Sequence, residues 1–440
     1  MNTKENELFE ALAEVPMIDV HTHLRDDQLS ARGLHDILLY HMSISDLYAS
    51  GYQYGQRLSN NPDCLEVENR LKSAMPYLLK TMNTSIRWGV QLILKDLYGW
   101  EKRLSEDNWQ EAHQVIKDRS EKNRALEIFK TLNIKRIGTE YLNKGKGKNQ
   151  NLFQYALEWG FFARKQWGFT DTPLYELERC WGKQPSTPTE IGLTERDKDI
   201  QKIKSIEDVE SALHYYVDTL PEEILSIATH ISADYSMLLP SDAEFEKALS
   251  NREDCNPDNE SIYASYIHER FLSILEEKRP DIVFQFSYGA EPMPYETMSR
   301  SSEQSIKGIA EFIHRHPDLK FQCFLASAKD NQGFCTMCRE LPNFSLAGFW
   351  WHNFFPSIIE TVMDERLDML PLNQQIGFFS DAYFTEWVYA KAIIVRHALA
   401  TNLEKRINRG QVDTKEALYI AREILFESPQ DLLRFKPSQF

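Results

Sequence analysis

Short apolar runs that alternate with amphipathic helical segments constrain the fold of this chain more than any other feature. Eight runs have the length and composition of buried strands, at residues 15–24, 133–138, 152–159, 223–230, 281–287, 320–326, 343–349 and 375–380. Most of them are followed by a segment of helical periodicity, such as 301–316 or 330–340. Strands that alternate with helices form parallel sheets, and eight such units can close into a barrel. We therefore predict an α/β fold, a (β/α)8 barrel of the TIM type.

The segment between the first two strands breaks this alternation. Residues 25–130 carry helical patterns at 34–47, 65–82 and 86–97, and no convincing strand. Pro76 falls inside the second pattern, where a proline breaks or kinks a helix. The simplest interpretation is a large helical insertion after the first strand. We interpret two later polar stretches as surface insertions, and we predict one domain over residues 1–440.

The composition is that of a globular protein, with 42% hydrophobic and 26% charged residues. A net charge of −16 argues against nucleic acid or an anionic membrane as the main partner, because both attract basic surfaces. The first residues are polar and lack the apolar core of a signal peptide. No run approaches the ~20 apolar residues of a membrane-spanning helix. We expect a soluble, cytoplasmic protein.

The first strand-like run ends in His21-Thr22-His23. Alternate residues of a strand share a face, so the two imidazoles are expected side by side at the carboxyl end of the strand. Two histidines on one buried face most often share a metal ion. The competing interpretation is a strand-to-loop turn in which backbone groups or water satisfy each ring. The apolar lead-in and the place near the N-terminus favour metal ligation.

Two more chemically active side chains end predicted strands. His230 ends the fourth run, and Asp381 follows the eighth. The last strand of a closed barrel lies beside the first, so Asp381 can join His21 and His23 around one divalent ion. Two histidines and one aspartate leave coordination positions open, as in catalytic zinc sites. Alternatively, Asp381 caps the helix predicted from residue 383, and His230 is a ligand, an acid or base, or a hydrogen-bonded residue at the barrel mouth.

Four motifs, in this order, resemble the uronate isomerases, a branch of the amidohydrolase superfamily. The motifs are His21-Thr22-His23, Leu38-Leu39-Tyr40-His41, Gly348-Phe349-Trp350-Trp351-His352-Asn353 and Ser380-Asp381-Ala382. The similarity spans nearly the whole chain and is strongest over residues 343–395. It implies a distorted (β/α)8 barrel with one divalent metal ion, usually zinc. It also implies interconversion of a hexuronate aldose, such as glucuronate or galacturonate, and its ketose by moving a proton between C1 and C2.

The resemblance also assigns roles to single residues. His21, His23 and Asp381 match the metal ligands of the family, and Asp381 is a natural proton carrier beside the metal. His41 matches a histidine that lies over the substrate, where it orients or protonates the sugar.

The same resemblance places three aromatic residues in the substrate pocket. Tyr40 precedes His41 in its motif, and Trp350 and Trp351 match the paired tryptophans before the last strand. Core packing is the alternative for at least one of these tryptophans, because indole rings are mostly buried bulk.

Three further positions in the predicted substrate pocket depart from the family pattern. Tyr383 and Glu158 stand where the family has arginines, and Met42 stands where related members have a tyrosine. An arginine binds a carboxylate through two parallel hydrogen bonds, which neither tyrosine nor glutamate can supply. The pocket is therefore either rebuilt for another sugar, such as one that is neutral or lacks the C6 carboxylate, or no longer catalytic.

We expect a metal-dependent aldose–ketose isomerase of hexuronate or related sugar catabolism, with a sugar or sugar acid as its small-molecule partner. Its predicted catalytic residues are Asp381, His41 and His230. Two alternatives stay open: a hydrolase of the amidohydrolase type, favoured if His230 is a metal ligand, and a sugar-binding homologue without turnover. Barrel enzymes often self-associate, so a homo-oligomer is compatible with the sequence, but no interface can be identified in it.

Overall fold

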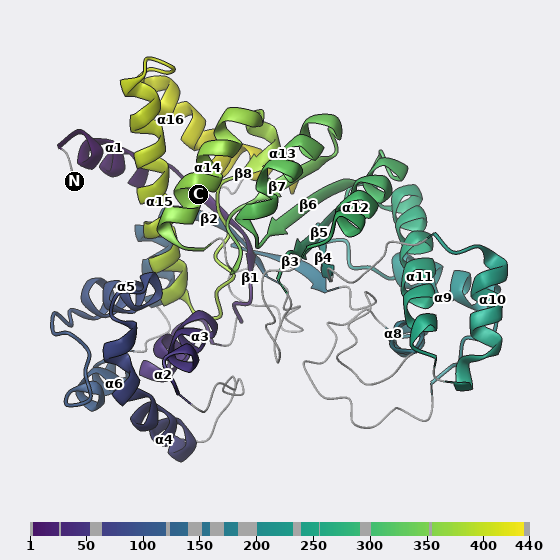
Figure 1. The fold of residues 1–440 in the computed structure, drawn as a ribbon, viewed down its shortest axis with the longest axis horizontal. Coiled ribbons are helices and arrows are strands. Elements are labelled where there is room, and N and C mark those ends of the chain that lie inside the picture. Colours follow the sequence, from purple (N-terminus) through teal and green to yellow (C-terminus); the bar gives the residue numbers. More distant parts are fainter. Residues whose placement is uncertain are drawn as a thin grey trace.

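The computed structural model describes residues 3–25, 28–52, 64–119, 124–139, 152–158, 171–183, 200–231, 239–254, 256–290, 301–351 and 354–434. Eight strands follow one another in sequence order in a single curled sheet with helices around it (Figure 1). Each neighbouring pair, from the first and second strands to the seventh and eighth, is parallel. The predicted fold class, a distorted (β/α)8 barrel, is confirmed.

Each strand overlaps one of the predicted runs. The strands are β1 (Met17–Thr22), β2 (Ile134–Thr139), β3 (Phe153–Glu158), β4 (Ser226–Ile231), β5 (Val283–Tyr288), β6 (Lys320–Leu325), β7 (Phe344–Ala347) and β8 (Gln375–Ile376). Phe286 and Phe321 belong to the hydrophobic core shared with the surrounding helices, whereas Gln285 donates a hydrogen bond of 2.7 Å to Gln322. Most of the strand residues are buried on both faces of the sheet, although Lys135 in β2 is exposed. This burial explains the nearly continuous apolar character of the strands.

The barrel is irregular where β8 approaches β1. β8 has only two residues, and the loop after it makes the contact with β1: the Asp381 amide donates to the His21 carbonyl at 3.0 Å. The amide of His23 donates in turn to the carbonyl of Ala382 at 2.9 Å. Two C-terminal segments, η8 (Glu423–Glu427) and α17 (Ser428–Leu432), pack against both strands. This closure brings the residues after β8 directly beside the two histidines.

The predicted helical insertion lies between β1 and β2. It contains α2 (Leu34–Leu38), α3 (His41–Ala49), α4 (Cys64–Ala74), η1 (Met75–Thr81), α5 (Ser85–Leu92), η2 (Ile93–Leu97), α6 (Trp109–Asp118) and α7 (Arg124–Thr131). Its first helices gather at one end of the molecule, at the lower left of Figure 1. Their buried side chains share one core with α15 (Thr385–Asn408), and the Trp387 indole donates to the Ile37 carbonyl at 3.0 Å.

Two helix boundaries in the insertion depend on local chemistry. The helical pattern predicted over 34–47 forms two helices, because the first helix ends at Leu38 and a new helix begins at His41. This break places His41 in the first turn of α3. Pro76 marks the predicted break in the next segment, where α4 gives way to a 3-10 helix with proline in its first turn.

The remaining helices surround the sheet or extend from it. They are α1 (Thr3–Ala13), α8 (Thr172–Cys180), α9 (Ile206–Asp218), α10 (Asp242–Ser250), α11 (Pro257–Lys278), α12 (Glu303–Arg315), α13 (Asn331–Glu340), α14 (Pro356–Met369) and α16 (Thr414–Arg422). Helices α8 to α11 lie at the opposite end from the insertion (Figure 1). In the described part of the chain, no helix has both the length and the apolar character of a membrane span.

Candidate metal centre

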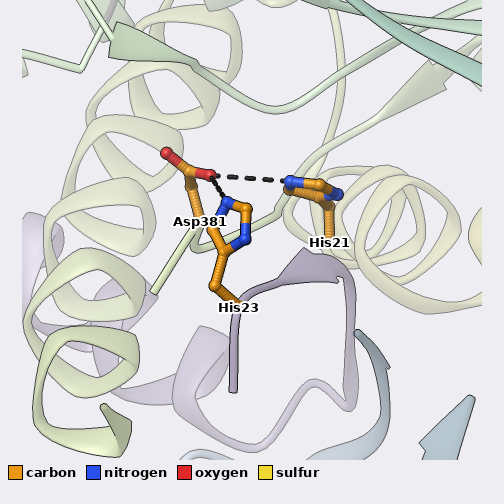
Figure 2. Close-up of side chains that lie close together, drawn as sticks. All are labelled: His21, His23 and Asp381. Carbon is orange, nitrogen blue, oxygen red and sulfur yellow. Dashed lines mark hydrogen bonds and ion pairs between the residues drawn. The ribbon is translucent and has the colours of Figure 1, made fainter. Parts of the chain in front are cut away.

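The three predicted metal ligands converge at the carboxyl end of β1. His21 lies near the end of that strand, His23 directly follows it, and Asp381 lies in the loop after β8. Both imidazoles turn their Nε2 atoms toward the same carboxylate oxygen of Asp381 (Figure 2). The distance to Oδ1 is 3.1 Å from His23 and 3.5 Å from His21. One potential ligand atom from each residue lies within 4.8 Å of the other two.

This donor set fits a divalent ion. A tetrahedral zinc ion with bonds of about 2.0–2.2 Å keeps neighbouring ligand atoms about 3.3–3.6 Å apart, close to the two separations observed. Two imidazole nitrogens and one carboxylate oxygen also leave at least one coordination position for substrate or water. The residues that are present therefore suit a catalytic metal site better than a closed structural one.

Burial and hydrogen bonding set the charge of the aspartate. His21 and Asp381 are each 7% exposed. Burial alone would raise the pKa of Asp381, but hydrogen bonds from His21 and His23 outweigh it and hold that pKa well below its usual range. The carboxyl group is therefore anionic, which is the form that binds a metal ion.

The alternative role of Asp381 as a helix cap does not agree with the structure. Helix α15 begins at Thr385, and its N-cap residue is Phe384, without a side-chain capping bond. Asp381 lies outside the helix and has a φ of +52°, in the left-handed region. Its conformation directs the carboxylate to the histidines instead of to the amides of the helix.

A buried lysine and tyrosine lie behind the site and contact its backbone. The Tyr40 hydroxyl donates to the Asp381 carbonyl at 2.7 Å. The Lys391 ammonium donates to the Ser380 carbonyl at 2.5 Å and to the Tyr40 oxygen at 3.0 Å. Burial lowers the pKa of Lys391 to about 8, although Asp381 and Asp19 oppose this shift.

A second buried carboxyl group, that of Asp19, lies below the site. Its Oδ1 accepts a hydrogen bond of 2.8 Å from the Ser380 amide, and burial raises its pKa to about 7. Sequence reasoning did not identify Asp19 or Lys391. Each is a single charged residue inside an apolar run of the sequence. Because charged residues are rarely buried without a partner, this pattern could have indicated a role for both.

Tyr383 and Tyr40, two of the predicted substrate residues, pack against the site. The ring of Tyr383 stacks on His23, and the ring of Tyr40 stacks on Trp387 with centroids 4.7 Å apart. Met42 is buried in α3 among the hydrophobic core of the insertion. The structure therefore brings the two tyrosines beside the predicted metal ligands, whereas Met42 packs into the core.

The other predicted pocket residues are described only in part. Trp350 and Trp351 are partly buried and stack with centroids 6.4 Å apart. His41 begins α3 and Glu158 ends β3, but their side chains lie outside the described part of the structure. The pocket roles of these four residues stay predictions.

His230 lies near the end of β4 and is buried. Its Nδ1 is 3.0 Å from the Ser287 hydroxyl, on the neighbouring strand in the same register, and its ring centroid is 5.9 Å from that of Trp350. Among the described residues, the group that could hold a metal ion comprises His21, His23 and Asp381, without His230. The structure therefore gives no support for His230 as a further metal ligand.

Comparison with known proteins shows the same fold in solved isomerase structures. Glucuronate isomerase from Caulobacter crescentus matches with a TM-score of 0.79 and 13% identity, over 99% of this chain and 95% of its own. Uronate isomerase from Thermotoga maritima matches with a TM-score of 0.76 and 13% identity, over 98% of both chains. No protein-family model and no curated protein matches the sequence. The fold of this chain is that of the uronate isomerase structures.

A different description accompanies a weaker match. A protein from Lactobacillus casei, provisionally described as a metal-dependent hydrolase, matches with a TM-score of 0.58 and 13% identity, over 97% of both chains. Both kinds of match share the fold of this chain, so the fold alone does not select the reaction.

Proposed function

We propose that this chain is a metal-dependent aldose–ketose isomerase that acts on hexuronates or on closely related sugars. The observation that carries the proposal is the convergence of His21, His23 and Asp381 at the carboxyl end of the barrel. In (β/α)8 barrels this end carries the active site. The full-length structural match to two sugar-acid isomerases supports the same reaction.

In this proposal His21, His23 and Asp381 hold one divalent ion, for which zinc is the expected metal. Such an ion supplies Lewis-acid polarisation of the sugar's carbonyl and hydroxyl oxygens, which favours loss of a proton from carbon. Oδ1 of Asp381 faces both histidines. We propose that the same carboxylate carries the proton between C1 and C2 through its other oxygen, Oδ2.

Two histidines are proposed to assist Asp381 in proton transfer. His230 has one ring nitrogen engaged by Ser287, which fixes the orientation of the ring. His41 occupies the first position of α3, directly after Tyr40 at the metal site. We propose that His41 orients or protonates the sugar and that His230 serves as a second acid or base.

The proposed substrate pocket is aromatic on the side of the metal ligands. Tyr383 covers His23, and Trp350 lies against His230. Small-molecule sites commonly combine such apolar surfaces with a few polar groups that fix orientation. Because Tyr383 replaces an arginine of the family pattern, we propose that a C6 carboxylate contributes less to binding here than a bidentate arginine would provide.

Hydrolysis is the second candidate, supported by the match to the Lactobacillus casei protein. It would gain support from a fourth protein ligand at the metal, for which His230 was the sequence candidate. His230 instead contacts Ser287 and Trp350. The set of potential ligands, which comprises His21, His23 and Asp381 without His230, therefore favours the isomerase proposal.

The test is turnover of purified, metal-supplemented protein on aldoses with and without a C6 carboxylate. The panel contains glucuronate, galacturonate and the corresponding neutral hexoses, and the Asp381→Asn variant is the control. Ketose formation from at least one sugar, lost in the variant, supports the proposal. Turnover of neutral sugars alone would identify neutral sugars as the substrate class and would place Tyr383 in the pocket that binds them. A metal-loaded protein that converts none of them contradicts the proposal.

A further inference from the structure

The backbone of Asp381 is held in a conformation that it would rarely adopt alone. Its φ of +52° places a residue with a side chain in the left-handed region, which only a few per cent of residues other than glycine adopt. Such conformations persist only where neighbouring groups determine them, and they concentrate at functional sites. The carboxylate of Asp381 therefore depends on whatever fixes this peptide.

Two residues of β1, His21 and Asp19, hold the backbone amides of the loop after β8. The Asp381 amide donates to His21 at 3.0 Å, and the Ser380 amide donates to the Asp19 carboxylate at 2.8 Å. These bonds set the height of the loop against β1. They leave the carbonyl groups of Ser380 and Asp381 to be held from another direction.

The carbonyl side is fixed by Tyr40 and Lys391, which arrive from two separate helical elements. Tyr40 is the N-cap residue of α3 in the insertion, and Lys391 lies in α15. Tyr40 donates to the Asp381 carbonyl and Lys391 donates to the Ser380 carbonyl. A hydrogen bond of 3.0 Å between the two side chains joins them into one unit.

This unit is itself rigidly packed. Tyr40 is 5% exposed and Lys391 3%. The Tyr40 ring stacks on Trp387, which precedes Lys391 by one helical turn, at an interplanar angle of 21°. The ammonium also lies over the Tyr40 and Phe354 rings, 5.3 and 4.8 Å from their centroids.

We propose that Tyr40 and Lys391 are positioning residues that hold the Asp381 carboxylate in the geometry required for metal binding. A rotation of the Asp381 peptide would move its carboxylate away from both histidines, and the hydroxyl of Tyr40 opposes that rotation by holding the carbonyl. Groups that support a metal ligand in this way typically contribute roughly 10–100-fold to metal affinity. The inference rests on the proposed metal-dependent function.

The test compares Tyr40→Phe with a matched control elsewhere in the chain. Tyr40→Phe removes one hydroxyl and keeps the ring on Trp387. Tyr263→Phe removes an equivalent buried hydroxyl that donates to the Ala248 carbonyl at 2.6 Å. Lys391→Met is the second variant at the site. For each protein, zinc affinity is measured by chelator competition, ligand geometry by the visible spectrum of the cobalt form, and stability by unfolding of the metal-free protein.

The expected result is a roughly 10–100-fold loss of zinc affinity in Tyr40→Phe and Lys391→Met, with an altered cobalt spectrum. Tyr263→Phe should keep the wild-type affinity and spectrum at a comparable loss of stability. Wild-type affinity and spectrum in Tyr40→Phe would overturn the inference, as would an equal loss of affinity in Tyr263→Phe. A wild-type protein that binds neither metal would instead overturn the proposed function on which the inference rests.

Discussion

The ring of Tyr383 lies flat against the imidazole of His23, with centroids 4.6 Å apart and an interplanar angle of 19°. At this position the uronate isomerase pattern has an arginine, whose guanidinium group would bind a substrate carboxylate. Tyr383 instead packs on His23, a predicted metal ligand, and limits the rotation of the imidazole ring. The residue that departs from the pattern is thus part of the ligand geometry.

This stacking predicts a graded effect on metal affinity. Stacked aromatic pairs contribute about 0.5–1.5 kcal/mol beyond their buried area, which corresponds to roughly a two- to tenfold change. Tyr383→Leu should therefore weaken zinc binding by about that factor, and Tyr383→Phe should not, because it keeps the ring. Chelator competition measures both values. Equal affinities in the leucine and phenylalanine variants would show that the stacking does not orient His23.

The close approach of β2 to β1 below His21 predicts a sharp effect at Gly138. A Cβ atom at this glycine would lie 2.4 Å from the Val20 carbonyl oxygen, which is backbone and cannot move aside alone. Gly138→Ala should lower the free energy of unfolding by about 1–3 kcal/mol, as overpacking does elsewhere. Urea unfolding measures this change.

Gly333 is the matched control for that substitution. It lies in α13, and a Cβ atom there would meet nothing within 4 Å. Gly333→Ala should raise stability by up to about 1 kcal/mol, because alanine favours a helix over glycine. If Gly138→Ala is as well tolerated as Gly333→Ala, β1 and β2 do not pack closely enough at Val20 and Gly138 to exclude a Cβ atom.

A buried ion cluster at the end of α12 predicts a pH dependence of stability. The His316 ring, 3% exposed, has Nδ1 at 3.0 Å from Glu276 and Nε2 at 3.4 Å from Glu269. Burial alone would lower the pKa of His316, but hydrogen bonds to the two carboxylates outweigh it and raise that pKa. Burial opposes ionisation of Glu269 as well, yet bonds to His316 and Arg315 lower its pKa to about 2.

The sign of the effect differs for the two groups. The His316 contribution is complete below the usual histidine pKa of about 6.5 and is lost as the pH rises through its higher folded value. The Glu269 contribution is present above about pH 4.5 and is lost as the pH falls toward 2. His316→Gln should therefore cost about 1.5–3 kcal/mol at pH 6 and less at higher pH. A cost that is constant or grows between pH 6 and pH 9 in urea unfolding would contradict a charged His316.

The strands and the proximity of His21, His23 and Asp381 could be predicted because their signals are local or follow from topology. Buried strands keep their apolar character on both faces, and alternation along β1 places His21 and His23 together. The eighth strand lies beside the first in a barrel, so Asp381 could be assigned to the same site across 358 positions of the sequence from His23. A helix cap competed for Asp381, and the left-handed conformation that excludes it is not written in the sequence.

The support behind the site could not be predicted, because its acceptors are backbone carbonyls. Tyr40 contacts the carbonyl of Asp381 across 341 positions, and Lys391 reaches Tyr40 across 351. No residue pattern identifies which carbonyl a buried hydroxyl will meet. The interruption between α2 and α3 at Leu39 and Tyr40 was also not predicted, since the helical periodicity continues across it.

The most direct test of the account is anomalous diffraction from crystals of the protein grown or soaked with zinc. We predict one anomalous peak per chain, at about 2.0–2.2 Å from the Nε2 atoms of His21 and His23 and from a carboxylate oxygen of Asp381. The same experiment on Asp381→Asn should show a much weaker peak or none. A zinc ion bound elsewhere, or a wild-type crystal without a peak between these three residues, would contradict the metal centre on which the proposed function depends.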